Sequence, residues 1–195
     1  MADILIVYYS RYGSVERMAQ QIALGVEAVD GCAAKIRCVA EISTTHEQID
    51  SPVPTDGPPY ATEDDLKNCD GLILGSPSYF GNMAAALKHY LDSSSQAWLS
   101  GALIGKPAGV FTATSSHHGG QESVLLSMMI PLLHHGMLIS GIPYSEPALQ
   151  QTQSGGTPYG ASHISGSSGK DLTDDEVQIC QALGRKIAEL SLKLA

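Results

Sequence analysis

The amino-acid sequence predicts an α/β fold in which a five-stranded parallel sheet carries helices on both faces. Short apolar runs rich in β-branched residues alternate along the chain with segments whose apolar residues recur every three or four positions. The run at residues 71–75 is apolar on both faces, as central strands of a parallel sheet are. Strands that alternate with helices need crossover connections, so the sheet is expected to be doubly wound.

Five segments have the composition of strands, and periodic segments between them have the composition of helices. The expected strands are residues 4–8, 34–39, 71–75, 108–112 and 137–142. The expected helices are residues 15–26, 63–68, 83–91, 124–133 and 174–194. Thr62 is expected to cap the second of these helices, and Thr173 begins a capping-box pattern that opens the last one. Pro131 is expected to kink the fourth helix and Gly136 to end it.

Two stretches lack a periodic pattern and are expected to be loops. Residues 51–60 are rich in proline and glycine. Residues 143–172 are rich in glycine, serine and glutamine and form a long insertion within a single domain of residues 1–195. Disorder is one interpretation of so long a loop. The Gly-Gly-Thr-Pro-Tyr-Gly run at residues 155–160 favours a fixed conformation instead.

Composition and charge argue against several classes of function. The chain has 195 residues, of which 43% are hydrophobic and 16% charged, which is enough for one well-buried domain. No apolar run is long enough to span a bilayer and no signal-peptide pattern opens the chain, so we expect a cytoplasmic protein without membrane insertion. The formal net charge of −9 disfavours nucleic-acid binding. Without a C-x-x-C pair, the cysteines are expected to be reduced thiols; they are Cys32, Cys38, Cys69 and Cys180.

The histidines do not have the spacing of metal ligands. Seven are present, including the adjacent pairs His117–His118 and His134–His135. Neighbours in sequence point in different directions, and no cysteine or carboxylate stands at ligand spacing, so no metal site is expected. A histidine near the end of the fourth helix is also favourable there simply as a cation.

The loop after the first strand has the chemistry of a phosphate site. Ser10 and Ser14 supply hydroxyl donors, and Gly13 lets a ligand approach the backbone closely. The loop leads into a helix whose N-terminus carries roughly half a positive charge, which suits a phosphate without a lysine. Because the loop has neither G-x-G-x-x-G nor G-K-[ST], dinucleotide binding and NTP hydrolysis are disfavoured. An ordinary serine-capped connection is the alternative.

Polar loops also follow the third and fourth strands, and the carboxyl ends of parallel strands meet at one edge of the sheet. The first of these loops contains Tyr79 and Phe80, which are suited to lie beside a flat ring, although Phe80 could instead fill the core. The second, residues 114–120, offers backbone N–H donors or is simply a solvated turn. The convergence of the three loops favours a site for flavin mononucleotide (FMN).

Five motifs occur in the order and spacing of one known family. They are S-x-Y-G at residues 10–13, G-S-P-S-Y-F-G-N-M at 75–83, G-G-Q-E at 119–122, H-H-G-M at 134–137 and G-G-T-P-Y-G-A at 155–161. With them the sequence resembles the WrbA family of flavodoxin-like, FMN-dependent NAD(P)H:quinone oxidoreductases from its first strand to its last helix. The resemblance implies the strand order 2-1-3-4-5, NADH or NADPH as electron donor, a quinone as acceptor, and a homodimer or homotetramer built with the insertion.

The resemblance also implies roles for individual residues. Tyr12 is a contact on the nicotinamide side, His134 a flavin contact and Trp98 a wall of the substrate pocket. The implied FMN-binding residues are Ser10, Arg11, Tyr12, Gly13, Ser14, Val15, Pro77, Ser78, Tyr79, Phe80, Gly81, Thr114, Ser115, Ser116, His117, His118, Gly119, Gly120 and His134. Many relatives have arginine in place of Tyr79 and a glycine-rich loop in place of residues 115–118. No side chain is assigned as a catalytic acid, because the chemistry belongs to the flavin.

These observations predict a quinone reductase with ping-pong kinetics, in which NAD(P)H and the quinone use the same face of the flavin in turn. Two alternatives stay open. The first is a flavodoxin-like one-electron carrier, against which the long insertion and Trp98 argue. The second is a regulatory or scaffolding module that binds FMN or a protein partner without turnover.

Overall fold

A parallel sheet in the order β2-β1-β3-β4-β5 forms the centre of the protein, as the computed structural model shows for residues 1–42 and 56–195. The predicted strand order is therefore confirmed, whereas residues 51–55 of the first expected loop lie outside the described residues. The strands are β1 (Ala2–Tyr8), β2 (Cys32–Cys38), β3 (Gly71–Pro77), β4 (Pro107–Thr114), β5 (Leu138–Ile139) and β6 (Ala161–Ile164). The helices are α1 (Ser14–Glu27), α2 (Glu63–Asn68), α3 (Ala85–Asp92), α4 (Ser95–Leu99), α5 (Gln121–His134), α6 (Pro147–Gln151) and α7 (Asp174–Leu194).

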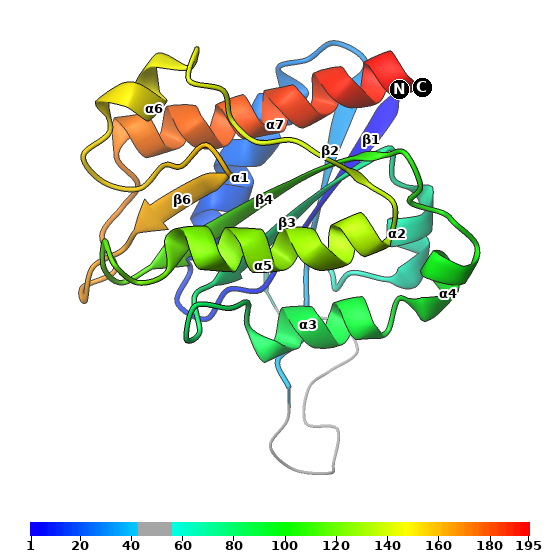
Figure 1. Ribbon diagram of the computed structural model, residues 1–195, viewed down its shortest axis with the longest axis horizontal. Coiled ribbons are helices and arrows are strands. Elements are labelled where there is room, and N and C mark those ends of the chain that lie inside the picture. Colours follow the sequence, from blue (N-terminus) through cyan, green and yellow to red (C-terminus); the bar gives the residue numbers. More distant parts are fainter. Residues whose placement is uncertain (43–55) are drawn as a thin grey trace.

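Helices cover both faces of the sheet (Figure 1). Along β1 successive side chains enter different cores, because strand side chains alternate between faces. Ile4 and Ile6 pack with residues of α1 and α7, whereas Leu5 and Val7 pack with residues of α3 and α5. Among the described residues, no helix has both the length and the apolar character that a bilayer crossing demands.

Both predicted helix caps are confirmed. The Thr62 hydroxyl accepts a hydrogen bond from the Asp65 N–H at the start of α2, and Thr173 and Glu176 form a reciprocal capping box at the start of α7. Helix α5 continues through Pro131 to His134, and the chain then turns at Gly136 with a φ of 80°. The kink at Pro131 stays a prediction.

The edge strand beside β4 is interrupted, which the sequence did not indicate. Strand β5 pairs with residues 107–108 of β4, and β6 pairs in parallel with residues 111–114 of the same strand. Residues 143–172 are thus not one continuous loop, since they contain both α6 and β6. The local pattern misses β6 because its burial comes from β4 and from α7, which lie far away in the sequence.

Candidate cofactor cleft

A cleft of about 700 Å³ lies at the edge of the sheet where β1, β3, β4 and β6 end. This volume is in the range of pockets that bind cofactors and other small molecules. The loops after these strands gather at one end of the molecule, at the left of Figure 1, in dark blue, green and orange. The lining residues are Ser10, Arg11, Tyr12, Ser14, Val15, Pro77, Ser78, Tyr79, Ala113, Thr114, Ser115, Ser165, Gly166, Ser167, Ser168 and Gly169.

The first loop presents donors to the cleft from the start of α1. Gly13 precedes the helix with a φ of 82°, a conformation that favours glycine. Ser10 Oγ accepts a bond from the Glu16 N–H at 3.4 Å, which leaves the Ser10 hydroxyl hydrogen free to donate. The backbone N–H groups of Ser14 and Val15 have no acceptor within the part of the chain that the structure describes. Together these donors fit the phosphate of FMN.

The second loop is a tight turn that carries Phe80 at its tip. Tyr79 and Asn82 exchange backbone hydrogen bonds of 2.9 and 3.1 Å, and Gly81 lies between them with a φ of 76°. Phe80 has a φ of 54°, and its side chain is fully exposed. The alternative in which Phe80 fills the core is therefore wrong. Phe80 and Gly81 do not reach the wall of the cleft, although Tyr79 does.

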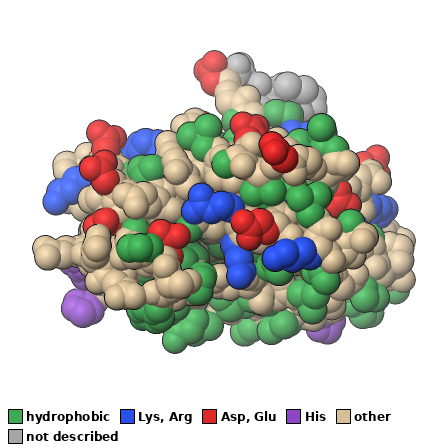
Figure 2. Space-filling view, turned by 90° about the horizontal axis from the view of Figure 1, so that it is seen from above, with side chains coloured by type: hydrophobic (Ala, Val, Ile, Leu, Met, Phe, Trp, Pro, Cys, Tyr) green, Lys and Arg blue, Asp and Glu red, His purple; other side chains and the backbone are tan. Residues whose placement is uncertain are grey.

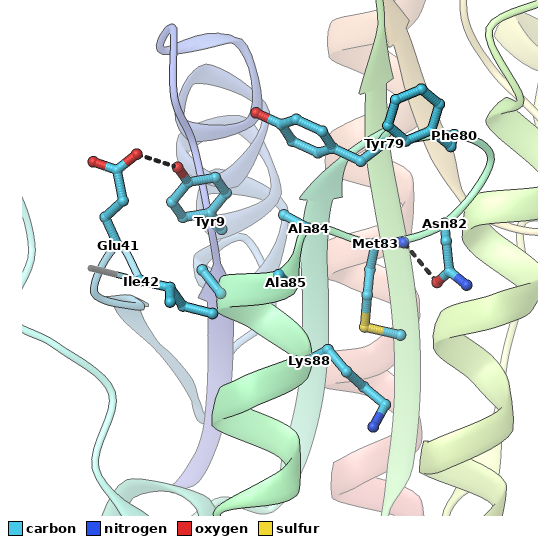
Figure 3. Close-up of a pocket in the computed structure, with 11 residues that line it drawn as sticks. Tyr9, Glu41, Ile42, Tyr79, Phe80, Asn82, Met83, Ala84, Ala85 and Lys88 are labelled. Atoms are coloured by element: carbon cyan, nitrogen blue, oxygen red, sulfur yellow. Dashed lines mark hydrogen bonds between the residues drawn. The ribbon is translucent and has the colours of Figure 1, made fainter. Parts of the chain in front are cut away.

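Tyr79 separates the cleft from a second pocket of about 530 Å³, which also contains Tyr9 and Phe80 (Figure 3). In that view the Tyr79 side chain extends toward Tyr9, whose hydroxyl donates to Glu41 at 3.1 Å. Burial and this hydrogen bond raise the pKa of Tyr9 to about 12, so it keeps its proton at neutral pH. On the cleft side the Arg11 guanidinium lies 5.5 Å from the ring centroid of the exposed Tyr12.

The third loop contributes fewer residues than predicted. Thr114 and Ser115 line the cleft, and the Thr114 hydroxyl donates to the Ser116 carbonyl at 2.9 Å. The predicted residues of this loop outside the wall are Ser116, His117, His118, Gly119 and Gly120. Two of them have structural roles instead. The Gly119 carbonyl accepts from Ser78 Oγ at 2.7 Å, which ties the second loop to the third, and Gly120 caps α5.

Trp98 and His134 lie away from the cleft of their own chain. Trp98 belongs to α4, where a plain connection was expected, and its ring stacks on His134 at the end of α5. Helix α5 begins beside the third loop, and its 14 residues span about 20 Å. The two rings therefore face another pocket, of about 360 Å³, that includes Ile130. Within one chain the flavin contact of His134 and the substrate wall of Trp98 are not assembled.

One wall of the cleft was not predicted from the sequence. The loop of residues 165–169 follows β6 and completes the side opposite the second loop. A Ser-Gly-Ser-Ser-Gly run after a strand would have indicated such a wall, but β6 itself was not predicted. Among residues 1–42 and 56–195 no cluster of His, Cys, Asp and Glu side chains could hold a metal ion.

Comparison with known proteins gives the same picture. Residues 4–145 match the family described as NADPH-dependent FMN reductase. A protein of Syntrophobacter fumaroxidans named NAD(P)H dehydrogenase (quinone) is 43% identical, and the alignment covers 98% of each chain. A protein of Solidesulfovibrio magneticus with the same name is 39% identical, again over 98% of each chain. A WrbA-like flavodoxin of Agrobacterium tumefaciens superimposes with a TM-score of 0.70 at 21% identity over the full length of both chains.

Proposed function

This chain belongs to the family of NADPH-dependent FMN reductases, and from that premise we propose that it is an FMN-dependent NAD(P)H:quinone oxidoreductase. The relatives that share 39–43% of its residues over nearly the whole chain carry the name of that activity. The observation that carries the proposal is the cleft at the strand ends, where helix-terminal donors and aromatic side chains meet. The chain is an enzyme whose cofactors are FMN and NAD(P)H.

The residues of the cleft divide the work of holding FMN. Ser10, Ser14 and the N–H groups at the start of α1 would hold the phosphate, since they are donors at the positive end of a helix. Tyr79 and Pro77 would flank the flat ring system. FMN, when bound, supplies the acceptance of a hydride from NAD(P)H and its delivery to the quinone. Tyr12 is 80% exposed at the mouth of the cleft, and we propose that it meets the nicotinamide.

Proton delivery does not need a dedicated side chain of the cleft. Burial raises the pKa of Tyr8 and Tyr9 well above neutral, so neither is tuned to give up a proton. The cleft opens to solvent beside Tyr12, whose ring is largely exposed. We therefore propose that water supplies the proton that the quinone takes up, and that a single exposed face imposes ping-pong kinetics.

We also propose that a second copy of the chain completes the substrate pocket. Trp98 and His134 lie beside exposed apolar side chains, which mark interaction surfaces when they cluster. Ile130 lines the same pocket as these two rings, and Leu99 and Leu133, which are next to Trp98 and His134 in sequence, are also exposed. Figure 2 looks onto a different side, where acidic and basic side chains are interspersed and hydrophobic ones gather along one margin. A homodimer or homotetramer in the cytoplasm accounts for this distribution.

Anaerobic stopped-flow mixing with NADH tests the proposal. The FMN-loaded protein should lose its flavin absorbance within the mixing experiment and recover it when benzoquinone is added. A one-electron carrier would oxidise NADH negligibly, and a scaffolding module would bind FMN without turnover. Parallel lines in double-reciprocal plots at several quinone concentrations are the expected sign of the ping-pong order. A flavin that NADH leaves unbleached contradicts the proposed enzyme.

A further inference from the structure

We propose that residues 165–169, which we call the fourth loop, bind the phosphate end of FMN together with Arg17. The inference rests on the proposed function and adds residues to its cofactor site. The loop lines the cleft but belongs to none of the three loops that carry the predicted site. Its role follows from where it is anchored, from the donors it presents and from the buried pair that holds it.

The anchors of the fourth loop place it at the phosphate end. At its start, the N–H and the hydroxyl of Ser165 both donate to the Thr114 carbonyl, at 2.9 and 3.1 Å. At its end, the carbonyl of Lys170 accepts from Arg17 Nη2 at 3.2 Å. Arg17 lies in the first turn of α1, directly after the first loop of the cleft. The fourth loop therefore runs from the third loop to the N-terminus of α1, away from Tyr79.

The fourth loop and Arg17 supply donors that suit a phosphate dianion. Ser167 and Ser168 carry exposed hydroxyls between two glycines of positive φ. Arg17 Nη2 also donates to Ser14 Oγ at 3.3 Å, so the Ser14 hydroxyl hydrogen is left to donate into the cleft. Among the described residues the Nε of Arg17 has no hydrogen-bond partner, and its one ion-pair contact is with the exposed Asp171 carboxylate at 3.9 Å. In a chain with a net charge of −9, this guanidinium gives local compensation for an anionic ligand.

The buried pair of His163 and Glu176 holds the fourth loop in place. His163 Nδ1 lies 2.9 Å from Glu176 Oε2, and its Nε2 lies 3.1 Å from the Lys170 carbonyl. Each ring nitrogen of His163 therefore faces an oxygen that can accept a hydrogen bond from it. Both side chains are fully buried. Glu176 also accepts from the N–H groups of Gly155 and Ile164, which joins the insertion to the start of α7.

The Lys170 carbonyl is thus shared by His163 and Arg17. It receives one bond from the buried pair and one from the first turn of α1. Because Arg17 belongs to α1 and His163 to β6, their two hydrogen bonds fix the end of the fourth loop between these elements. His163 is a positioning residue here, whereas Arg17 and the hydroxyls of Ser167 and Ser168 are the groups expected to touch the ligand.

Comparing FMN with riboflavin isolates the phosphate. The apoprotein is titrated into each flavin and the quenching of flavin fluorescence is followed. Arg17→Gln and the double variant Ser167→Ala/Ser168→Ala should each raise the Kd for FMN roughly tenfold or more, as expected when hydrogen bonds to a charged group are lost. Their Kd for riboflavin should match that of the unmodified protein. Arg185→Gln, a change of an exposed cation on α7, is the matched control.

The outcomes separate this inference from the proposed function. Unchanged FMN affinity in the variants, or equal weakening of FMN and riboflavin, overturns the role of the fourth loop. Failure of the unmodified protein to bind FMN contradicts the proposed function itself. His163→Gln supplies a second arm: amide hydrogen exchange of residues 165–170 should become faster while the sheet stays protected, and FMN affinity should fall. Unaltered exchange in that variant overturns the assignment of the buried pair as the anchor.

Discussion

The indole ring of Trp98 stacks on the imidazole ring of His134, with 5.7 Å between ring centroids and 25° between ring planes. The two residues come from α4 and from the last turn of α5, so the pair is built where two helix ends meet. The cleft includes Thr114 and Ser115 of the third loop, and this loop leads into the start of the same α5. The two rings are already stacked, but they lie away from the cleft of their own chain. This position is explained if they form part of the cleft of a neighbouring copy.

Ile130→Glu should separate assembly from cofactor binding. The side chain is 68% exposed and lines the pocket beside Trp98, so a carboxylate there costs the isolated chain little but opposes burial against a second copy. Light scattering should show smaller particles and FMN titration an unchanged Kd, while kcat/KM for the quinone falls roughly tenfold or more. Leu192→Glu, on the opposite face, is the control. Full turnover in a monomeric Ile130→Glu protein would contradict the shared pocket.

Local sequence patterns were sufficient to predict the helices and strands that bury a continuous stripe of apolar side chains. The central strands, α1 and α7 follow from apolar periodicity and from the threonine caps Thr62 and Thr173, because these signals act within a few residues. The cleft followed in part, since Ser10, Ser14 and Tyr79 come directly after predicted strands. Cleft residues can therefore be predicted from sequence where they directly follow a strand that the local pattern identifies.

The missed features depend on contacts between distant parts of the chain. Strand β6 is buried by β4 and α7, and no short window of sequence reports this. The fourth loop was missed with it. The roles of Trp98 and His134 came from resemblance, which aligns residues but does not state which copy of a chain they serve. Phe80 was undecided between core and site, and only its backbone conformation and exposure resolve that question.

Phe80→Asn should stabilise the apoprotein. At a φ of 54° a bulky residue is strained by about 1–2 kcal/mol, whereas asparagine tolerates this conformation. The Phe80 ring is fully exposed, so its removal sacrifices no packing within the chain. Urea unfolding should show a gain of about 1 kcal/mol. Phe80→Leu keeps the strain, so it should show no gain. A destabilised Phe80→Asn protein would mean that the turn is not strained.

Glu176→Gln should reduce stability most near neutral pH. Burial by itself would raise the pKa of Glu176, but hydrogen bonds from His163, Thr173 and Gly155 outweigh it and lower the pKa from 4.5 to about 2. A lowered carboxylate pKa stabilises the fold above pH 4.5, and this contribution is lost as the pH falls toward about 2. The variant should lose about 3 kcal/mol of unfolding free energy near neutral pH, and the gap to the unmodified protein should narrow in acid. Glu189→Gln, exposed on the same helix, is the control. A gap that is independent of pH would contradict the ionised state of Glu176.

Gly184→Ala should destabilise the protein through the contact between α1 and α7. A Cβ on Gly184 would lie 2.0 Å from the Ile22 carbonyl oxygen, and one on Gly25 would lie 2.0 Å from that of Gln181. The two helices therefore approach each other through reciprocal glycines, and a methyl group at either forces them apart. Although alanine favours helix by about 1 kcal/mol, the clash should cost about 1–3 kcal/mol or more, so the net change is a loss in thermal and urea unfolding. Gln178→Ala, an exposed site on α7, should leave stability nearly unchanged. Because α1 also carries the phosphate loop, FMN affinity should fall together with stability in Gly184→Ala, and unchanged affinity would show that the cleft tolerates a shift of this helix.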